Sequence, residues 1–380
     1  MSFNYIETAP SAENARKIMK EPAEIMSKSD FRMVNLENIF GDKATGEPII
    51  KSGPNLISDD GYMEYVKALN PTIVGLANNH AKDYGEAPML YTKALLEKEG
   101  YIAIGAGKNL DEAYAPAEIS KDGVNVSIIA VCENEFGIAR RNESGTAGFM
   151  LGRVAHGIFD ARKKGSKPVV YFHGGNERNP FPSPMKAELY RHFIDIGAEA
   201  VIAMHTHCPQ GFEMYNGKPI VYSMGNFFFP ATRLNDRKTW SYGYMSTLDI
   251  KNDSISLEIH PYSFDFDGIY MMKGEELARF EEYLALIAAP ISDPDKLDEL
   301  FDIWCMTQEH YINALEKYDA SMLREGDKEC IKGIKNVFGC EAHNELVTNM
   351  LKMIYDGRVA EAEKKTYIIE KLQAYETDDF

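Results

Sequence analysis

Short apolar runs alternate with helical patterns over the first two thirds of this 380-residue chain, and this alternation limits the possible folds more than any other feature. The apolar runs are rich in Val and Ile and short enough to be buried strands, with amphipathic segments between them. Such alternation is typical of an α/β fold with a largely parallel sheet. The expected strands are 31–36, 72–77, 101–104, 125–132, 168–173, 200–204 and 219–224. The expected helices are 11–20, 60–69, 87–99, 154–164 and 184–196, with Pro22 breaking or kinking the first.

The pattern changes after residue 240. Two alternating segments, 244–250 and 254–261, flank Lys251-Asn252-Asp253 and predict a β-hairpin. From about Gly274 onward the pattern is amphipathic and helical, over 274–288, 295–318, 341–355 and 358–374. We therefore expect an α/β domain over residues 1–270 and a helical extension over residues 271–380.

Charge and composition exclude several classes of partner. The chain has 41 Lys and Arg against 58 Asp and Glu, a net charge of −17, and no basic run that would attract nucleic acid or an anionic membrane. No apolar stretch reaches the roughly 18 residues that a membrane helix needs, and the first thirty residues do not resemble a signal peptide. The five cysteines are scattered, which predicts reduced thiols and a cytoplasmic location.

Four histidines lie where predicted strands end. His80 follows the strand 72–77, His173 ends the strand 168–173, and His205 and His207 follow the strand 200–204. Ligands of open α/β sheets bind at the carboxyl ends of strands, so these side chains are expected to converge. Neutral imidazoles are common metal ligands, although each single histidine also fits a polar residue at a loop mouth.

Other candidates follow the same strand ends. Glu37 ends the strand 31–36, and its carboxylate is suited either to bridge two cations or to cap the next turn. Asn79 offers an amide oxygen ligand or serves as a turn residue. Asp83 is predicted to orient His80, the alternative being a helix cap. Cys208 is assigned to packing, because a hydrolytic two-metal site favours nitrogen and oxygen ligands.

Two glycine motifs indicate tight backbone. His173-Gly174-Gly175 and Gly225-Asn226 follow predicted strands, where glycine permits sharp turns and close backbone approach. Glu177 lies just beyond the first motif and fits either a substrate contact or a solvated loop carboxylate.

Five motifs in a fixed order carry a family resemblance. They are Asn-Leu-Glu, Leu-Ala-Asn-Asn-His-x-x-Asp-Tyr-Gly, His-Gly-Gly-x-Glu, His-x-His and Pro-Ile-x-Tyr-Ser-x-Gly-Asn-Phe. This order resembles the poly-γ-glutamate capsule-synthesis (CapA-type) proteins of the calcineurin-like metallophosphoesterase superfamily. The similarity runs from about Asp30 to Pro261, which leaves the C-terminal helices outside it.

The resemblance implies a four-layer α/β/β/α sandwich and a site for two divalent ions, which nitrogen and oxygen ligands suit to Mn, Fe or Zn. Glu37 would bridge the ions, and His207 would bind one of them. His80 would act as the acid near the leaving group, assisted by Asp83. The other ion would take Asn79, His173 and His205, and we assign substrate binding to Glu177, Gly225 and Asn226.

The chain departs from the family pattern at its start. The family opens with an apolar strand ending in Gly-Asp, whose aspartate binds an ion, and no such strand precedes the helix at Ser11. The Gly41-Asp42 pair comes after Glu37 and is expected to be a turn. Either the start of the chain is assigned too late or the protein has lost a strand and a ligand, and in this sequence we expect the ion at His207 to be weakly held or absent.

The leading hypothesis is a metal-dependent hydrolase resembling metallophosphoesterases, acting on a small-molecule or polymer substrate and linked by resemblance to capsule biosynthesis. An alternative is a non-catalytic or scaffold protein of polymer synthesis with a degenerate metal site. A third is an amide hydrolase that cleaves γ-glutamyl bonds with the same metals. The oligomeric state is left open.

Overall fold

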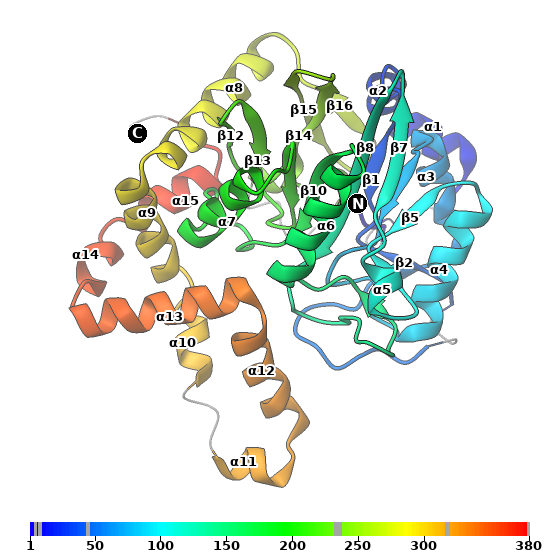
Figure 1. The fold of residues 1–380 in the computed structure, drawn as a ribbon. Helices are drawn as coiled ribbons and strands as arrows, with labels where there is room; N and C mark the ends of the chain where they lie inside the picture. Colours follow the sequence, from blue (N-terminus) through cyan, green and yellow to red (C-terminus); the bar gives the residue numbers. More distant parts are fainter. Residues whose placement is uncertain (4–5, 7–9, 43–45, 232–237, 316–319, 378–380) are drawn as a thin grey trace.

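The larger of two mainly parallel sheets is built from the middle of the chain (Figure 1). The structure, a computed structural model, describes residues 1–3, 6, 10–42, 46–231, 238–315 and 320–377. The strands of this sheet are β7 (Ala117–Lys121), β8 (Val124–Cys132), β10 (Lys167–His173), β11 (Ala200–Met204), β12 (Phe212–Tyr215) and β13 (Lys218–Val221). Their order is β12-β13-β11-β10-β8-β7, with β8, β10, β11 and β13 parallel and the two edge strands antiparallel.

The smaller parallel sheet comes from the first third of the chain. It consists of β1 (Met33–Asn35), β4 (Ile73–Gly75) and β5 (Ile102–Ile104), in the order β1-β4-β5. Two short pairs flank it, β2 (Ile39–Phe40) with β3 (Ile57–Ser58) and β6 (Ala106–Gly107) with β9 (Gly145–Thr146). The predicted α/β class with largely parallel strands is confirmed.

Helices connect the strands of both sheets. They are α1 (Ala12–Ile18), α2 (Lys20–Met26), the 3₁₀ helix η2 (Asp60–Tyr62), α3 (Met63–Leu69), α4 (Glu86–Lys98), α5 (Leu110–Ala113), α6 (Leu151–Lys163) and α7 (Pro184–Asp195). The predicted helix 11–20 ends at Ile18, and Pro22 lies in the first turn of a second helix, where its missing N–H is tolerated. Ser183 caps α7 as expected, since its Oγ accepts from the Lys186 N–H at 3.3 Å.

The two parallel sheets share one core. A Cβ added to Gly75 of β4 would lie 2.9 Å from Cε1 of Tyr171 on β10, so these strands face each other closely. Alternate residues point the other way, as the two-residue period of strands requires. Val74 packs into the cluster with Tyr65 of α3, while the ring of Phe172 lies against that of Tyr190 of α7 in a tilted arrangement.

An antiparallel sheet follows the parallel ones. The predicted hairpin is confirmed as β14 (Tyr242–Ile250) and β15 (Ile255–Phe264), and β16 (Ile269–Met271) joins them in the order β14-β15-β16. The 3₁₀ helix η4 (Lys238–Ser241) precedes it. Strands β1 and β14 are both edge strands of their sheets, and both line a cavity of about 810 Å³ whose wall also includes β10.

Met1 lies at one end of this cavity. Its amino group donates to the Asn35 carbonyl at 2.8 Å, and the Glu37 N–H donates to the Met1 carbonyl at 3.0 Å, so Met1 pairs with the end of β1. Among the described residues before Ser11, none belongs to a strand. The expected absence of the family's first strand stays a prediction.

The last part of the chain is helical, as predicted, and occupies the yellow-to-red part of Figure 1. The helix α8 (Gly274–Ala288) matches its predicted range, and the predicted helix 295–318 divides into α9 (Pro294–Met306) and α10 (His310–Leu315), its final residues lying outside the described ones. The remaining helices are η5 (Ala289–Ser292), α11 (Ala320–Glu325), α12 (Lys328–Gly339), α13 (Glu341–Asp356), α14 (Val359–Glu363) and α15 (Tyr367–Gln373). The boundary between domains at residue 270 stays a prediction.

The sequence analysis missed α11, α12 and the edge strands β7 and β12. The edge strands join their neighbours through two-residue turns, Asp122-Gly123 and Asn216-Gly217, in which all four residues have positive φ. Asp-Gly and Asn-Gly are strong signals for tight hairpins, so both strands were readable from the sequence.

Candidate metal centre

Ligand-type side chains follow the carboxyl ends of neighbouring parallel strands. Glu37 lies two residues beyond β1, and Asn79 lies four residues beyond β4. His173 is the last residue of β10, and His205 is the first residue after β11. Because parallel strands deliver their carboxyl ends to one side, the fold brings these side chains together, as the sequence predicted.

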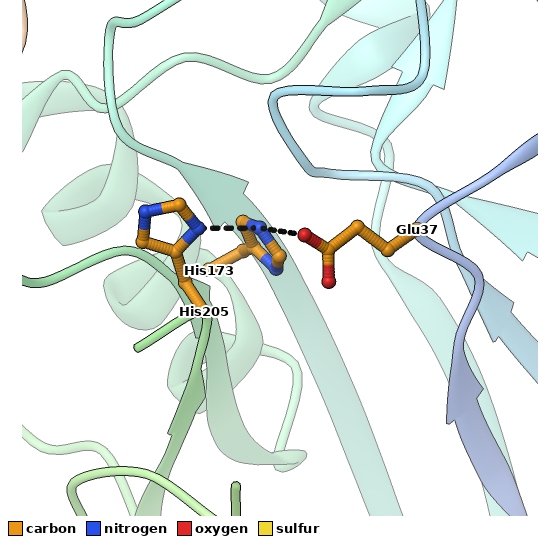
Figure 2. Close-up of side chains that lie close together, drawn as sticks. All are labelled: Glu37, His173 and His205. Carbon is orange, nitrogen blue, oxygen red and sulfur yellow. Dashed lines mark hydrogen bonds and ion pairs between the residues drawn. The ribbon is translucent and has the colours of Figure 1, made fainter. Parts of the chain in front are cut away.

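His173 lies at the centre of the cluster (Figure 2). Its Nε2 is 3.1 Å from His205 Nδ1, 3.2 Å from Asn79 Oδ1 and 3.8 Å from Glu37 Oε1. Ligands bound at about 2.0–2.2 Å to one ion lie roughly 3–4 Å from each other. The spacing therefore fits a single cation held by these residues.

The electrostatics of the cluster suit a cation. Burial lowers the pKa of His173 well below its usual value, and the neighbouring His205 and His207 lower it further, so the imidazole is neutral and able to bind metal. Glu37 is only 5% exposed, and its Oε1 has no hydrogen-bond partner among the described residues. A buried carboxylate oxygen without a partner is costly, and a bound cation would satisfy it.

His207 approaches Glu37 from the other side. Its Nε2 is 3.8 Å from Glu37 Oε1, while its Nδ1 is 2.8 Å from Asn226 Oδ1. The Asn226 amide group donates to the carbonyls of His207 and Trp240, which fixes its Oδ1 as the acceptor facing the ring. His207 must then carry its proton on Nδ1, which leaves the Nε2 lone pair directed toward Glu37.

The backbone of the His-x-His motif is strained. His205 has a φ of 105° and His207 a φ of 58°, a region that residues other than glycine rarely adopt. Such conformations cost of order 1–3 kcal/mol each and cluster at functional sites. Surrounding contacts offset the strain. Among them, the ring of His207 stacks on that of Trp240, with 4.8 Å between the ring centroids.

His80 belongs to a buried network. Its Nδ1 is 2.7 Å from Asp83 Oδ2 and 2.9 Å from Lys51 Nζ, and Lys51 Nζ is 2.5 Å from Asp83 Oδ1. Asp83 thus contacts the ring of His80, and its predicted role in orienting that ring stays a prediction. Lys51 was not predicted, because it comes from a distant loop without a motif. Burial lowers the pKa of Lys51, and the Asp83 carboxylate partly opposes that shift.

Glu135 orients Asn79 and was also missed. Its Oε2 accepts from Asn79 Nδ2 at 2.6 Å, which turns Asn79 Oδ1 toward His173. Burial raises the pKa of Glu135 above its usual value. The residue follows the end of β8, so the strand-end rule that found the other candidates would have found it.

The first turn of α13 forms hydrogen bonds with the loops that follow β8 and β10. Glu341 accepts from the Asn134 N–H at 2.9 Å, and the Ala342 carbonyl accepts from Asn176 Nδ2 at 3.1 Å. Nearby, Glu133 forms a buried ion pair with Lys186 of α7, and its N–H donates to the His173 carbonyl. Breaking such a buried pair typically costs about 3–5 kcal/mol, so the loop after β8 is firmly held.

The remaining predicted residues lie around the cavity and the His207 side. Gly225 and Asn226 line the cavity, and an added Cβ at Gly225 would lie 2.7 Å from the Tyr242 carbonyl, so a side chain is excluded there. Glu177 Oε1 is 4.0 Å from His207 Nε2. Cys208 is buried with its Sγ 3.2 Å from the Asn179 carbonyl, in keeping with a packing role.

Within the described residues, no helix combines the length and the apolar character that a membrane span requires.

Comparisons with known proteins agree on one family. The family model described as bacterial capsule synthesis protein PGA_cap matches residues 4–231. The chain is 29% identical to the PGA biosynthesis protein CapA of Bacillus subtilis (strain 168), over 64% of this chain and 65% of that protein. It is 27% identical to the capsule biosynthesis protein CapA of Bacillus anthracis, over 59% and 57%. The chain thus matches less than two thirds of either relative.

A more distant relative is the probable polyglutamine synthesis accessory protein of Mycobacterium tuberculosis, 28% identical over 42% of this chain and 45% of its own. A solved structure, TT1561 of Thermus thermophilus, aligns with 65% of this chain and 92% of its own at 12% identity. Its TM-score of 0.34 is too low to support a conclusion about the fold.

Proposed function

This chain belongs to the PGA_cap family of bacterial capsule synthesis proteins, and from that membership we propose that it is a metal-dependent hydrolase of phosphoester type that serves the synthesis of an anionic polymer. The link to poly-γ-glutamate rests on the family resemblance and on the name of the Bacillus subtilis relative, a PGA biosynthesis protein. The proposal includes a polymer or polymer-precursor substrate, an α/β/β/α metallophosphoesterase sandwich over residues 1–270 and a separate helical unit beyond.

One observation carries the proposal. The buried Glu37 Oε1 has no hydrogen-bond partner among the described residues, and the Nε2 atoms of His173 and His207 each lie 3.8 Å from it. A carboxylate between imidazoles from different strand ends suits a bridge between two divalent ions such as Mn, Fe or Zn. Bound there, such ions supply an activated water and stabilise charge on phosphoryl oxygens.

The protein's own residues supply a proton for the leaving group, the orientation of a ligand and access for the substrate. Asp83 Oδ2 accepts the proton of His80 Nδ1, and Lys51 pairs with the other Asp83 oxygen, which leaves Nε2 as the nitrogen that exchanges a proton with a leaving oxygen. Glu135 holds the Asn79 amide in the orientation that presents its oxygen to the His173 side. The cavity of about 810 Å³ reaches Glu37, His205 and His207 and gives a substrate access to them.

Metal content tests the proposal first. Protein loaded with Mn²⁺ or Zn²⁺ and dialysed should retain metal and melt at a higher temperature than protein treated with EDTA, because a ligand that binds only the folded state stabilises it. Equal melting temperatures together with no metal by elemental analysis would support the alternative, a non-catalytic protein of polymer synthesis. Release of amine from a γ-glutamyl amide, without phosphoester hydrolysis, would reassign the same residues to amide hydrolysis.

The leaving-group dependence of His80→Asn tests the chemistry. A nitrophenolate leaves without a proton, whereas an alkoxide needs one, so the variant should lose about 10²–10⁴-fold on alkyl esters and far less on nitrophenyl esters. His192→Asn, an equal change on the exposed face of α7, serves as the control. An equal loss on both ester types would make His80 a structural residue.

A further inference from the structure

The His207 side of the site includes Glu177, a residue that the sequence analysis assigned to substrate binding and not to a metal. Beyond Glu37, the next carboxylate near His207 is Glu177, whose Oε1 is 4.0 Å from His207 Nε2. Glu177 sits on the loop that follows β10, four residues beyond His173. Its side chain is 45% exposed, against 7% for Glu37, so it faces the open side of the site.

The loop that carries Glu177 is anchored on both sides. The Arg178 N–H donates to the Thr206 carbonyl, between His205 and His207, at 2.6 Å. Asn176 Nδ2 donates to the Ala342 carbonyl of α13 at 3.1 Å. Gly175 has a φ of 120°, a backbone conformation that glycine adopts readily and that permits a sharp turn before Glu177. The backbone that carries Glu177 is therefore held beside His207.

Each of the two carboxylates lies within reach of an ion bound to His207. Two ligands bound at about 2.0–2.2 Å to the same ion lie at most about 4.4 Å apart, and both carboxylates lie within that reach of His207 Nε2. The tautomer fixed by Asn226 directs the Nε2 lone pair toward them. The unpartnered, nine-tenths buried Glu37 Oε1 is an independent sign that a cation belongs between these groups.

Charge points the same way. Glu177 brings a second carboxylate to His207, besides that of Glu37. Its other oxygen, Oε2, is 4.0 Å from Arg178 Nη2, which leaves Oε1 directed to His207. Two carboxylates and one neutral imidazole carry a charge of −2, the complement of a divalent ion.

Building on the proposed function, we propose that Glu177 is the third protein ligand of a second divalent cation, bound with Glu37 and His207. Nitrogen and oxygen donors of this kind take Mn²⁺, Fe²⁺ or Zn²⁺ rather than a soft ion. The competing role, a solvated loop carboxylate paired with Arg178, predicts no effect of Glu177 on metal binding.

Titration of the protein with Mn²⁺ alone tests the assignment. Calorimetry measures each binding event, and electron paramagnetic resonance detects coupling between two bound ions. The wild type should show a tight and a weaker binding event, with an exchange-coupled signal when both sites fill, because Glu37 bridges them. Glu177→Gln should weaken only the second event, by at least about tenfold, and lose the coupled signal. Glu177→Asp should bind the second Mn²⁺ with an affinity between those of the wild type and Glu177→Gln. His207→Ala should lose the second binding event.

Glu188→Gln, the same chemical change on the exposed face of α7, should bind as the wild type does. Wild-type affinity for the second ion in Glu177→Gln would overturn the assignment while leaving the proposed function intact. So would a wild type that binds one Mn²⁺ and a Glu177→Gln variant that binds it equally. No binding of Mn²⁺ or Zn²⁺ by the wild type would defeat the proposed function itself. Unchanged melting temperatures of the metal-free variants confirm that they fold.

Discussion

The two sides of Glu37 differ in how fully the fold encloses them. On the His173 side, three further donors lie around one nitrogen, two of them at 3.1 and 3.2 Å, and Glu135 fixes the orientation of Asn79. On the His207 side, the distances to Glu37 and Glu177 are 3.8 and 4.0 Å. That side borders the cavity between β1 and β14, two strands that end their sheets.

This difference teaches that a side chain can lie near an ion site and still have to lose conformational freedom before it binds the ion. Donors on strand ends with fixed rotamers have already lost their freedom during folding, so a cation meets a preformed site. A half-exposed carboxylate on a loop must be ordered when the ion binds, which costs part of the binding free energy. We therefore expect the His173 side to bind first and more tightly.

The largest expected effect comes from His173→Ala. Removing the nitrogen on which the first site centres should abolish metal that survives dialysis, and with it the rise in melting temperature on metal loading. Elemental analysis and thermal melts of loaded and EDTA-treated protein measure both. His192→Ala on the exposed face of α7 is the control. Full metal retention in His173→Ala would mean that the tight site lies on the His207 side and would reverse the comparison.

A smaller and one-sided effect is expected from Asn226→Ala. Loss of the amide frees the tautomer of His207, and loss of such an outer partner typically costs about 10–100-fold in metal affinity. The second Mn²⁺ event in calorimetry should weaken accordingly, with the first unchanged. Asn226→Asp keeps an acceptor for the Nδ1 proton and should recover most of the affinity.

Asn344→Ala, on the exposed surface of α13, is the matched control for Asn226→Ala. If Asn226→Ala weakened both Mn²⁺ binding events equally, the His173 and His207 sides would not bind metal independently, which would contradict the comparison.

The smallest effect on metal binding concerns α13, whose Ala342 carbonyl anchors Asn176 in the Glu177 loop. Glu345 on α13 accepts from Ser183 Oγ at 2.6 Å, and burial raises its pKa to about 7. A carboxyl with a raised pKa binds its proton more tightly in the folded state, so its contribution is complete below about pH 4.5 and is lost as the pH rises through 7. The contribution is at most about 3 kcal/mol, reduced by partial exposure.

Urea unfolding between about pH 4.5 and 8 measures this contribution. Glu345→Gln should flatten the decline in the free energy of unfolding over that range, whereas Glu188→Gln should leave the decline in place. The same rise in pH should weaken the second Mn²⁺ event more than the first, once ligand protonation is allowed for, because α13 anchors Asn176 beside Glu177. If the free energy of unfolding of Glu345→Gln declined with pH as steeply as that of the wild type, Glu345 would not be the source of the pH dependence.

Much of the fold was predictable because local patterns match their surroundings. The apolar runs became β1, β4, β5, β8, β10, β11 and β13 with small shifts of their ends, and the cap and proline at Ser183 and Pro184 placed the start of α7. Gly274–Ala288 is amphipathic at helical spacing and is a helix over that range. The edge strands β7 and β12 have weak apolar patterns, and the sequence marks them mainly through the tight turns at Asp122-Gly123 and Asn216-Gly217.

The sequence by itself determined which residue types stand at the strand ends, since a parallel sheet delivers every carboxyl end to one side and the run lengths set where each strand stops. Glu37, Asn79, His173, His205 and His207 follow from that rule. Only the tertiary structure decided how they are oriented. Lys51 reaches His80, Glu135 turns Asn79, and Asn226 fixes His207 from 19 residues away. These contacts depend on the packing of loops against each other, which no local period or spacing encodes.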